Sequence, residues 1–114
     1  MFDWKDYFKL AKELAKSKKE SRLRSTVSRA YYAAFCTARN HAITLGYRTQ
    51  GSGDHGGVPK FYASRNTQFP GVGQKLGRLR RNRNNCDYND VVLGLSSKSQ
   101  KAIMEANAIL SQIP

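Results

Sequence analysis

The sequence predicts an all-α fold, a helical bundle that forms one domain over residues 1–114. Apolar side chains recur at spacings of three and four in several long segments, which is typical of amphipathic helices. No segment of useful length alternates apolar and polar residues as a half-buried strand does. Glycine and proline gather between the periodic segments, where they favour helix ends and turns.

The first two helices are predicted over residues 3–18 and 21–45, with Asp3 and Ser21 as N-cap candidates. In the first helix, a stripe containing Trp4 lies opposite a row of lysines. In the second helix, Gly46 provides a stop. The predicted inner stripe of the second helix, which we expect to be central, contains Leu23, Val27, Ala30, Tyr31, Ala34, Ala38, Ala42 and Leu45.

The remaining elements follow a Gly-rich loop, predicted over residues 46–57 between the second and third helices. A short third helix is predicted over 58–64, and residues 66–73 form a connection. A strongly basic helix begins at residue 72 or 74 and ends at 85, and residues 87–90 form a turn. The last helix covers residues 95–112 and buries Ile103, Ala106, Ile109, Leu110 and Ile113.

The charge is strongly positive, because 20 Lys and Arg oppose 8 Asp and Glu for a formal net charge of +12. Nucleic acid is the commonest partner of so basic a domain. A general solvating surface is the alternative, and an anionic membrane surface is disfavoured because no helix combines a cationic face with a broad apolar one. We expect no membrane contact, because no apolar run approaches about 20 residues. We also expect a cytoplasmic protein, because no secretory signal begins the chain and two cysteines cannot build a disulfide scaffold.

The segment from Lys75 to Tyr88 is the most informative, because it holds five cations before its first acid, Asp87. Arg83 falls on an apolar helical stripe, where burying a guanidinium is costly unless it has a partner or lines a wet pocket. It could pair with Asp87, four residues on, and merely fix the helix end. Alternatively, Arg83, Asn84 and Asp87 share a face with Arg80 and present a planar cation and an amide to a phosphate.

Three motifs in order resemble those of the HEPN (higher eukaryotes and prokaryotes nucleotide-binding) domain family. Residues 28–39, with Tyr31-Tyr32-Ala33, look like its Tyr-Tyr-Ala signature. Residues 54–58 resemble the loop, often carrying a histidine, before its third helix. Residues 83–88 are similar to its Arg-Asn-x-Ala-Asp-Tyr signature. Helix order and spacing agree over nearly the whole chain.

This resemblance implies a HEPN-like bundle of four to five helices that forms a homodimer, with the motif helices facing across a shared cleft. Many members of the family are metal-independent ribonucleases, among them toxins of toxin–antitoxin pairs and antiviral defence effectors. In some toxins a partner antitoxin attaches a nucleotide to the motif tyrosine. The resemblance therefore implies an antitoxin or nucleotidyltransferase as a partner, and Tyr88 as a site for that modification.

The sequence departs from the nuclease pattern, in which Arg is followed after four to six residues by His. Counting from Arg81, the fifth position is Cys86, and counting from Arg83 it is Tyr88. Neither register supplies the histidine, so the most obvious general acid–base is missing. His55, in the predicted loop, could swing toward the basic helix and replace it, or could be an exposed loop histidine.

The functional hypothesis is a HEPN-type endoribonuclease in which Arg83 and Asn84 grip the scissile phosphate and Asp87 and Tyr88 shape the site. The predicted RNA-binding residues are Arg78, Arg80, Arg81 and His55. One alternative is an inactive module that binds RNA, a nucleotide or a partner protein in the same cleft. Another is a structural subunit that docks on an acidic protein.

No metal ion or other cofactor is expected. Cys36 and His41 are five residues apart on a helix and point away from each other, and no second pair exists. The segment 71–77 lacks the spacing of a phosphate-binding loop and a preceding strand.

Overall fold

The computed structural model describes all 114 residues, and every regular element in it is a helix, which confirms the all-α prediction. The elements are α1 (Lys5–Leu14), α2 (Glu20–Thr44), the short 3₁₀ helix η1 (Gly51–Gly53), α3 (Asp54–Ala63), α4 (Val72–Tyr88) and α5 (Leu95–Leu110). None of these helices is both long enough and apolar enough to cross a membrane.

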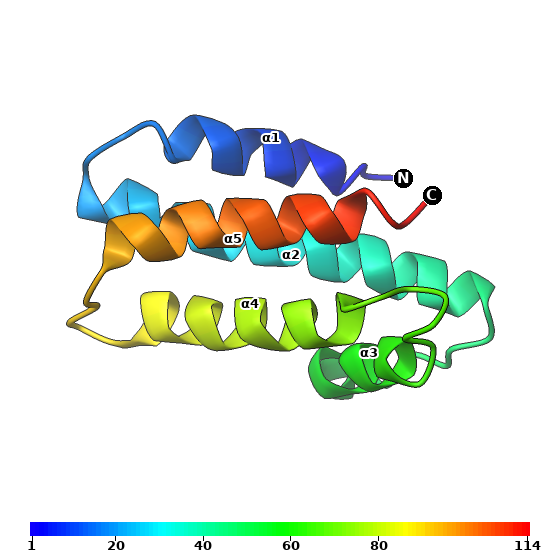
Figure 1. Cartoon of the computed structure of the whole chain (residues 1–114). Helices are drawn as coiled ribbons and strands as arrows, with labels where there is room; N and C mark the ends of the chain where they lie inside the picture. Colours follow the sequence, from blue (N-terminus) through cyan, green and yellow to red (C-terminus); the bar gives the residue numbers. More distant parts are fainter.

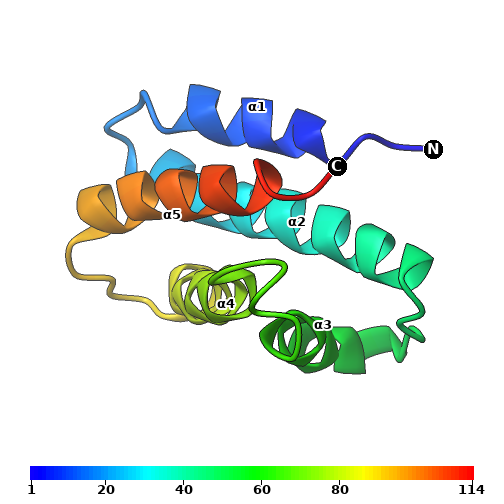
Figure 2. The same ribbon diagram turned by 45° about the vertical axis from the view of Figure 1, so that its right-hand side comes forward.

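The helices pack around α2, which contacts each of the other four (Figure 1). α1 and α5 lie side by side over one face of α2, and α4 packs against α2 and α5 below them. The short α3 lies beneath the far end of α2, against the beginning of α4, as the turned view also shows (Figure 2). This arrangement brings the start of α3 close to the basic helix α4, although the connection between them is long.

The core follows the stripe predicted for α2. Val27, Ala30, Ala34, Ala38 and Ala42 are all fully buried, and the small side chains let α1, α4 and α5 approach α2 closely. Leu45 is an exception, since α2 ends at Thr44 and its side chain is exposed. The other helices fill the core with Ala11, Val58, Tyr62, Val72, Leu76, Leu79, Cys86, Ala102, Ala106 and Ile109, and Ile113, which follows α5, joins them.

The boundary between α1 and α2 differs from the prediction. Trp4, not the predicted Asp3, occupies the cap position of α1, and the Oδ1 of Asp3 accepts the backbone N–H of Lys5 at 3.0 Å. α1 ends at Leu14 and α2 begins at Glu20, so the predicted cap at Ser21 is also wrong. Lys19 occupies the cap position in an extended conformation, and its carbonyl accepts the N–H of Leu23 at 3.0 Å.

The loop after α2 is shorter than predicted, because α3 begins at Asp54 rather than at residue 58. The buried Asp54 carboxylate accepts hydrogen bonds from the Tyr47 and Thr49 hydroxyls, both at 2.6 Å, and from the Gln50 N–H at 2.7 Å. These bonds fold residues 47–53 back onto the first turn of α3. Only Gly46, Gly51 and Gly53 of the predicted Gly-rich loop therefore lie between the two helices.

The helix α4 continues to Tyr88, so the turn predicted at residues 87–90 begins later, at Asn89. Arg24 on α2 explains the extension, because its guanidinium donates to the carbonyls of Cys86 at 2.9 Å, Asn89 at 2.6 Å and Asp90 at 2.9 Å. A cation that satisfies the last carbonyls of a helix also complements the negative end of the helix dipole. The last helix, α5, ends two residues before the predicted boundary.

Candidate nucleic-acid interface

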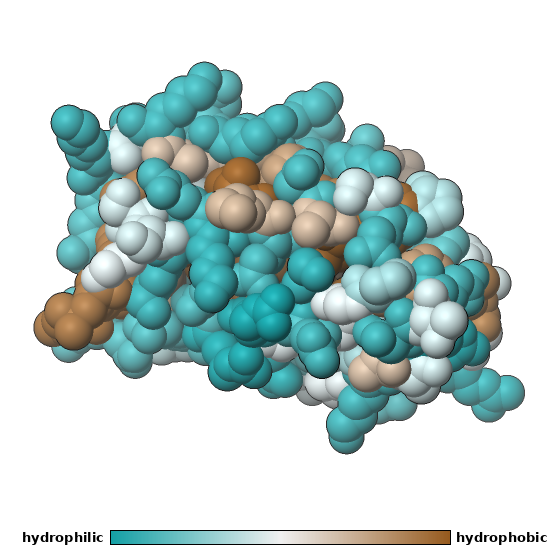
Figure 3. Space-filling model, viewed as in Figure 1, coloured by the Kyte–Doolittle hydropathy of each residue, from teal (hydrophilic) through white to brown (hydrophobic).

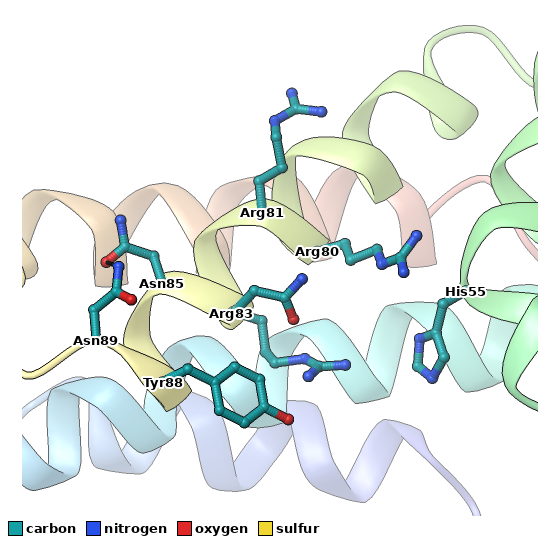
Figure 4. A pocket seen from close by; sticks show the side chains of 8 residues that line it. His55, Arg80, Arg81, Arg83, Asn85, Tyr88 and Asn89 are labelled. Atoms are coloured by element: carbon teal, nitrogen blue, oxygen red, sulfur yellow. Dashed lines mark hydrogen bonds between the residues drawn. The ribbon is translucent and has the colours of Figure 1, made fainter.

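A solvent-open pocket of about 520 Å³ lies between the start of α3 and the second half of α4. No carboxylate lines this pocket. Acidic residues occur on every α-helix, but α4 has none before Asp87. Figure 4 shows Arg80, Arg83 and the Tyr88 hydroxyl directed toward His55 across the pocket. The lining residues are His55, Arg80, Arg81, Arg83, Asn84, Asn85, Tyr88 and Asn89.

The pocket brings together most of the site residues that the sequence singled out: His55, Arg80, Arg81, Arg83, Asn84 and Tyr88. Arg81 lies at its rim, and its guanidinium points away from the others in Figure 4. The exposed Arg80 side chain reaches toward α3, where its Nη1 is 3.8 Å from the position a Cβ on Gly56 would take.

Asp87 and Arg78 lie outside this pocket. The Asp87 Oδ2 accepts a long hydrogen bond from the Ser28 hydroxyl at 3.5 Å, in a separate hollow between α2 and α4. Arg78 lies on the side of α4 that faces α5, where its Nε donates to the buried Glu105 carboxylate at 2.7 Å. A paired arginine on that side tethers α4 to α5, and the structure does not place it with the pocket residues.

Arg83 is buried, with 7% of its surface exposed, at the position where the helical stripe predicted an apolar residue. Its guanidinium carbon lies 5.0 Å from the centre of the Tyr31 ring and 5.1 Å from that of Tyr32, which places a cation over two aromatic faces. Its Nε has no hydrogen-bond partner, and the Asp87 carboxylate is 3.9 Å away. The predicted pairing with Asp87 therefore exists, but it is too long to satisfy the guanidinium.

His55 lies in the first turn of α3, so its placement in a flexible loop was wrong. Its ring stacks on Phe35 with the ring centres 4.5 Å apart, and its Nδ1 is 2.5 Å from the Tyr31 hydroxyl. Burial, together with the nearby Arg83 and Arg80 guanidiniums, lowers the pKa of His55 below its ordinary value. The imidazole is thus held in place and favours its neutral form at neutral pH.

Tyr31 links the two halves of the site, because it contacts both His55 and Arg83. Burial raises the pKa of Tyr31 to about 12, although Arg83 and Arg80 oppose the change, so its hydroxyl keeps its proton at neutral pH. The sequence placed Tyr31, next to Tyr32, on the predicted inner stripe of α2. Tyr31 is buried as expected, but both rings also support a cation that faces the pocket.

Asn85 and Asn89 also line the pocket, and neither was among the predicted site residues. The Asn89 Nδ2 donates to the Asn85 Oδ1 at 3.2 Å, one turn apart at the end of α4. Asparagine recurs at positions 82, 84, 85 and 89, and this repeat of a polar side chain along the basic helix is the sequence feature that could have identified them. Asn85 and Asn89 both reach the pocket because α4 extends to Tyr88, beyond its predicted end at residue 85.

Comparisons with protein-family models, with curated proteins and with solved structures find no match to this chain. The chain has no group of three or more His, Cys, Asp or Glu side chains placed to hold a metal ion together. The chemistry of the pocket therefore has to be judged from its own residues: guanidiniums, amides, one imidazole and one phenol, which together fit an anionic ligand with hydrogen-bonding edges.

Proposed function

We propose that this protein is an endoribonuclease that binds single RNA strands in the pocket between α3 and α4 and cleaves them without a metal ion. Arg83 and Arg80 hold the scissile phosphate, Asn84 donates its amide to a phosphate oxygen, and His55 transfers protons. Tyr88 shapes the pocket wall beside them. This proposal keeps the residues predicted from the sequence, apart from Asp87 and Arg78, which lie elsewhere.

The observation that carries the proposal is the buried Arg83 cation, whose Nε has no hydrogen-bond partner, in a pocket without carboxylates. A buried cation whose nearest carboxylate is 3.9 Å away has lost most of its water without gaining a full partner. A phosphate that enters the pocket supplies the missing acceptors, and a guanidinium binds phosphate oxygens in pairs. Arg80, exposed and without an ion-pair partner, provides a second cation on the same side of α4.

The reaction requires little covalent chemistry from the protein. The RNA 2′-oxygen attacks the adjacent phosphorus, and the bond from phosphorus to the 5′-oxygen breaks. The products are a 2′,3′-cyclic phosphate and a 5′-hydroxyl. The proton leaves the 2′-hydroxyl for a general base, and a proton returns to the 5′-oxygen. The Arg83 guanidinium, held over two aromatic rings, and that of Arg80 stabilise the negative charge that develops on the phosphate oxygens.

His55 is the side chain in the pocket best suited to carry the proton. When its Nδ1–H donates to the Tyr31 oxygen, Nε2 bears the lone pair that a general base needs. The lowered pKa of His55 keeps the neutral imidazole, which a general base requires, populated at neutral pH. A histidine on α3 thus takes the role of the one that the α4 motif lacks.

The test is cleavage of a labelled single-stranded RNA in EDTA, followed on a denaturing gel. The wild-type protein should cut, and Arg83→Ala should lower the rate by about 100-fold or more, the usual effect of removing a group that stabilises transition-state charge. His55→Ala should act similarly. Arg80→Gln should also lower the rate, and because Arg80 is exposed this change leaves the core undisturbed. Lys18→Gln, also exposed but in the α1–α2 connection, is the control and should leave the rate unchanged.

Circular dichroism of each variant separates lost chemistry from lost fold. Undiminished cutting by folded Arg83→Ala and His55→Ala would refute the catalytic assignment. RNA that is retained but left whole by the wild-type protein would instead identify a binding module. That reading is favoured by the absence of a histidine from the α4 motif.

A further inference from the structure

The pocket is chemically divided along its length. His55, Arg80 and Arg83 occupy one end, whereas Asn85, Asn89 and the ring of Tyr88 occupy the other (Figure 4). A phosphate accepts hydrogen bonds and donates none, so it has no donor for the amide oxygens of Asn85 and Asn89. The amide end therefore needs a different explanation.

Tyr88 offers a large aromatic surface to solvent. It is 73% exposed, and no other aromatic ring or cation packs over its ring, unlike Tyr31 and Tyr32. Exposed apolar side chains continue from it into the α4–α5 connection, where Val91 and Leu93 are 75% and 82% exposed. Figure 3 shows apolar surface gathered at this end of the molecule. An open ring face next to a phosphate site is a platform for stacking a base.

The two amides present a donor beside an acceptor. Because the Asn89 Nδ2 already donates to the Asn85 Oδ1, the Asn85 Nδ2 and the Asn89 Oδ1 remain free for a ligand. The edge of a nucleobase carries such a donor and acceptor side by side in one plane, whereas a phosphate carries acceptors alone. The Arg24 guanidinium fixes the chain here through the carbonyls of Cys86 and Asn89, so the amide end is held rigidly.

We propose that the amide end is a nucleobase subsite, in which a base next to the bound phosphate stacks on Tyr88 and pairs its edge with the Asn85 and Asn89 amides. This inference rests on the proposed function, because it assumes that the phosphate of an RNA strand occupies the cationic end. It also specifies the substrate, since only an unpaired base has a free edge and a free face to offer. The protein is therefore selective for single strands at this position.

The test compares two fluorescent probes by anisotropy. One is a mixed-sequence RNA of six nucleotides with 2′-O-methyl groups, which cannot be cut, and the other is the same backbone without bases. The wild-type protein should bind the base-bearing probe at least about fivefold more tightly, the lower range for one stacked base. Tyr88→Leu and Asn89→Ala should remove that preference, so that each variant binds the two probes with equal affinity. Asn82→Ala, on α4 but outside the pocket, is the matched control and should keep it.

The outcomes separate this inference from the proposed function. Equal affinity of the wild-type protein for both probes would overturn the base subsite, while phosphate binding would stand. Equal losses on both probes in Tyr88→Leu would overturn it as well, because a base platform cannot affect an abasic strand. If neither probe binds, both proposals fail. A duplex of the same sequence should bind no more tightly than the abasic strand, and tighter duplex binding would contradict the selectivity for single strands.

Discussion

At the scale of single residues, the site depends on how Arg83 and His55 share the aromatic rings of α2. Arg83 lies over Tyr31 and Tyr32, and His55 stacks on Phe35 while its Nδ1 contacts the Tyr31 hydroxyl. Aromatic faces hold a cation without neutralising it, so the guanidinium remains available to a ligand. A carboxylate in their place would have bound Arg83 and closed the site to anions.

The titration of His55 tests this geometry. Burial, Arg83 and Arg80 lower its pKa, so removing one cation in Arg80→Gln should raise the pKa of His55 toward its ordinary value. The C2–H resonance of the imidazole, followed by NMR against pH, reports the change. His41, the other histidine of the chain, gives a reference resonance in the same spectra. A His55 titration that is identical in both proteins would mean that Arg80 does not approach the ring.

Part of this residue-scale picture was predictable. The cost of placing a guanidinium on an apolar stripe singled out Arg83, and the structure does bury that side chain against rings and a pocket. His55 was misplaced because glycines at 51, 53, 56 and 57 predicted a loop. The hydrogen bonds to Asp54 that begin α3 come from Tyr47, Thr49 and Gln50, and apolar periodicity does not reveal such polar contacts.

At the scale of elements, the approach of α3 to α4 sets the width of the pocket. Gly73, in the first turn of α4, packs directly against the α3 backbone. A Cβ there would lie 2.6 Å from the Pro59 carbonyl oxygen and 2.9 Å from the Ala63 nitrogen. Neither backbone atom can move without moving α3, so glycine at this position lets the two helices touch. Gly77, one turn later, has open space around it apart from the end of the Arg81 side chain at 3.6 Å.

The two glycines give a matched pair of substitutions. Gly73→Ala should destabilise the protein by about 1–3 kcal/mol, the typical cost of overpacking, and should weaken RNA binding because α3 carries His55 away from α4. Gly77→Ala should stabilise it by about 0.5–1 kcal/mol, since alanine loses less backbone entropy in a helix interior. Urea unfolding measures both. A Gly73→Ala variant as stable as the wild-type protein would show that the helices are not in close contact.

Apolar periodicity predicted all five α-helices and their order along the chain. The boundaries were less predictable where a distant residue decides them. The Arg24 fork on α2 lengthens α4 to Tyr88, which brings Tyr88 and Asn89 to the pocket. No local sequence signal links positions 24 and 89, which are far apart in the chain.

At the scale of the whole molecule, the net charge of +12 makes association with a polyanion favourable before any specific contact forms. Much of the positive charge lies on exposed side chains away from the pocket, including the lysines of α1, which does not contact α4. A general electrostatic attraction and the proposed phosphate site would both favour RNA binding, and affinity alone does not distinguish them. The homodimer and the antitoxin or nucleotidyltransferase partner that the HEPN resemblance implies stay predictions.

The salt dependence of RNA binding distinguishes the two contributions and tests the central claim most directly. For a single strand, the slope of log K against log salt is about −0.7 for each phosphate neutralised. With the uncleavable RNA hexamer, Arg80→Gln should reduce the magnitude of the slope by about 0.7, the loss of one phosphate contact. Lys18→Gln should leave the slope as it is in the wild-type protein. Equal slopes for all three proteins would contradict the claim that RNA phosphates lie in the pocket between α3 and α4.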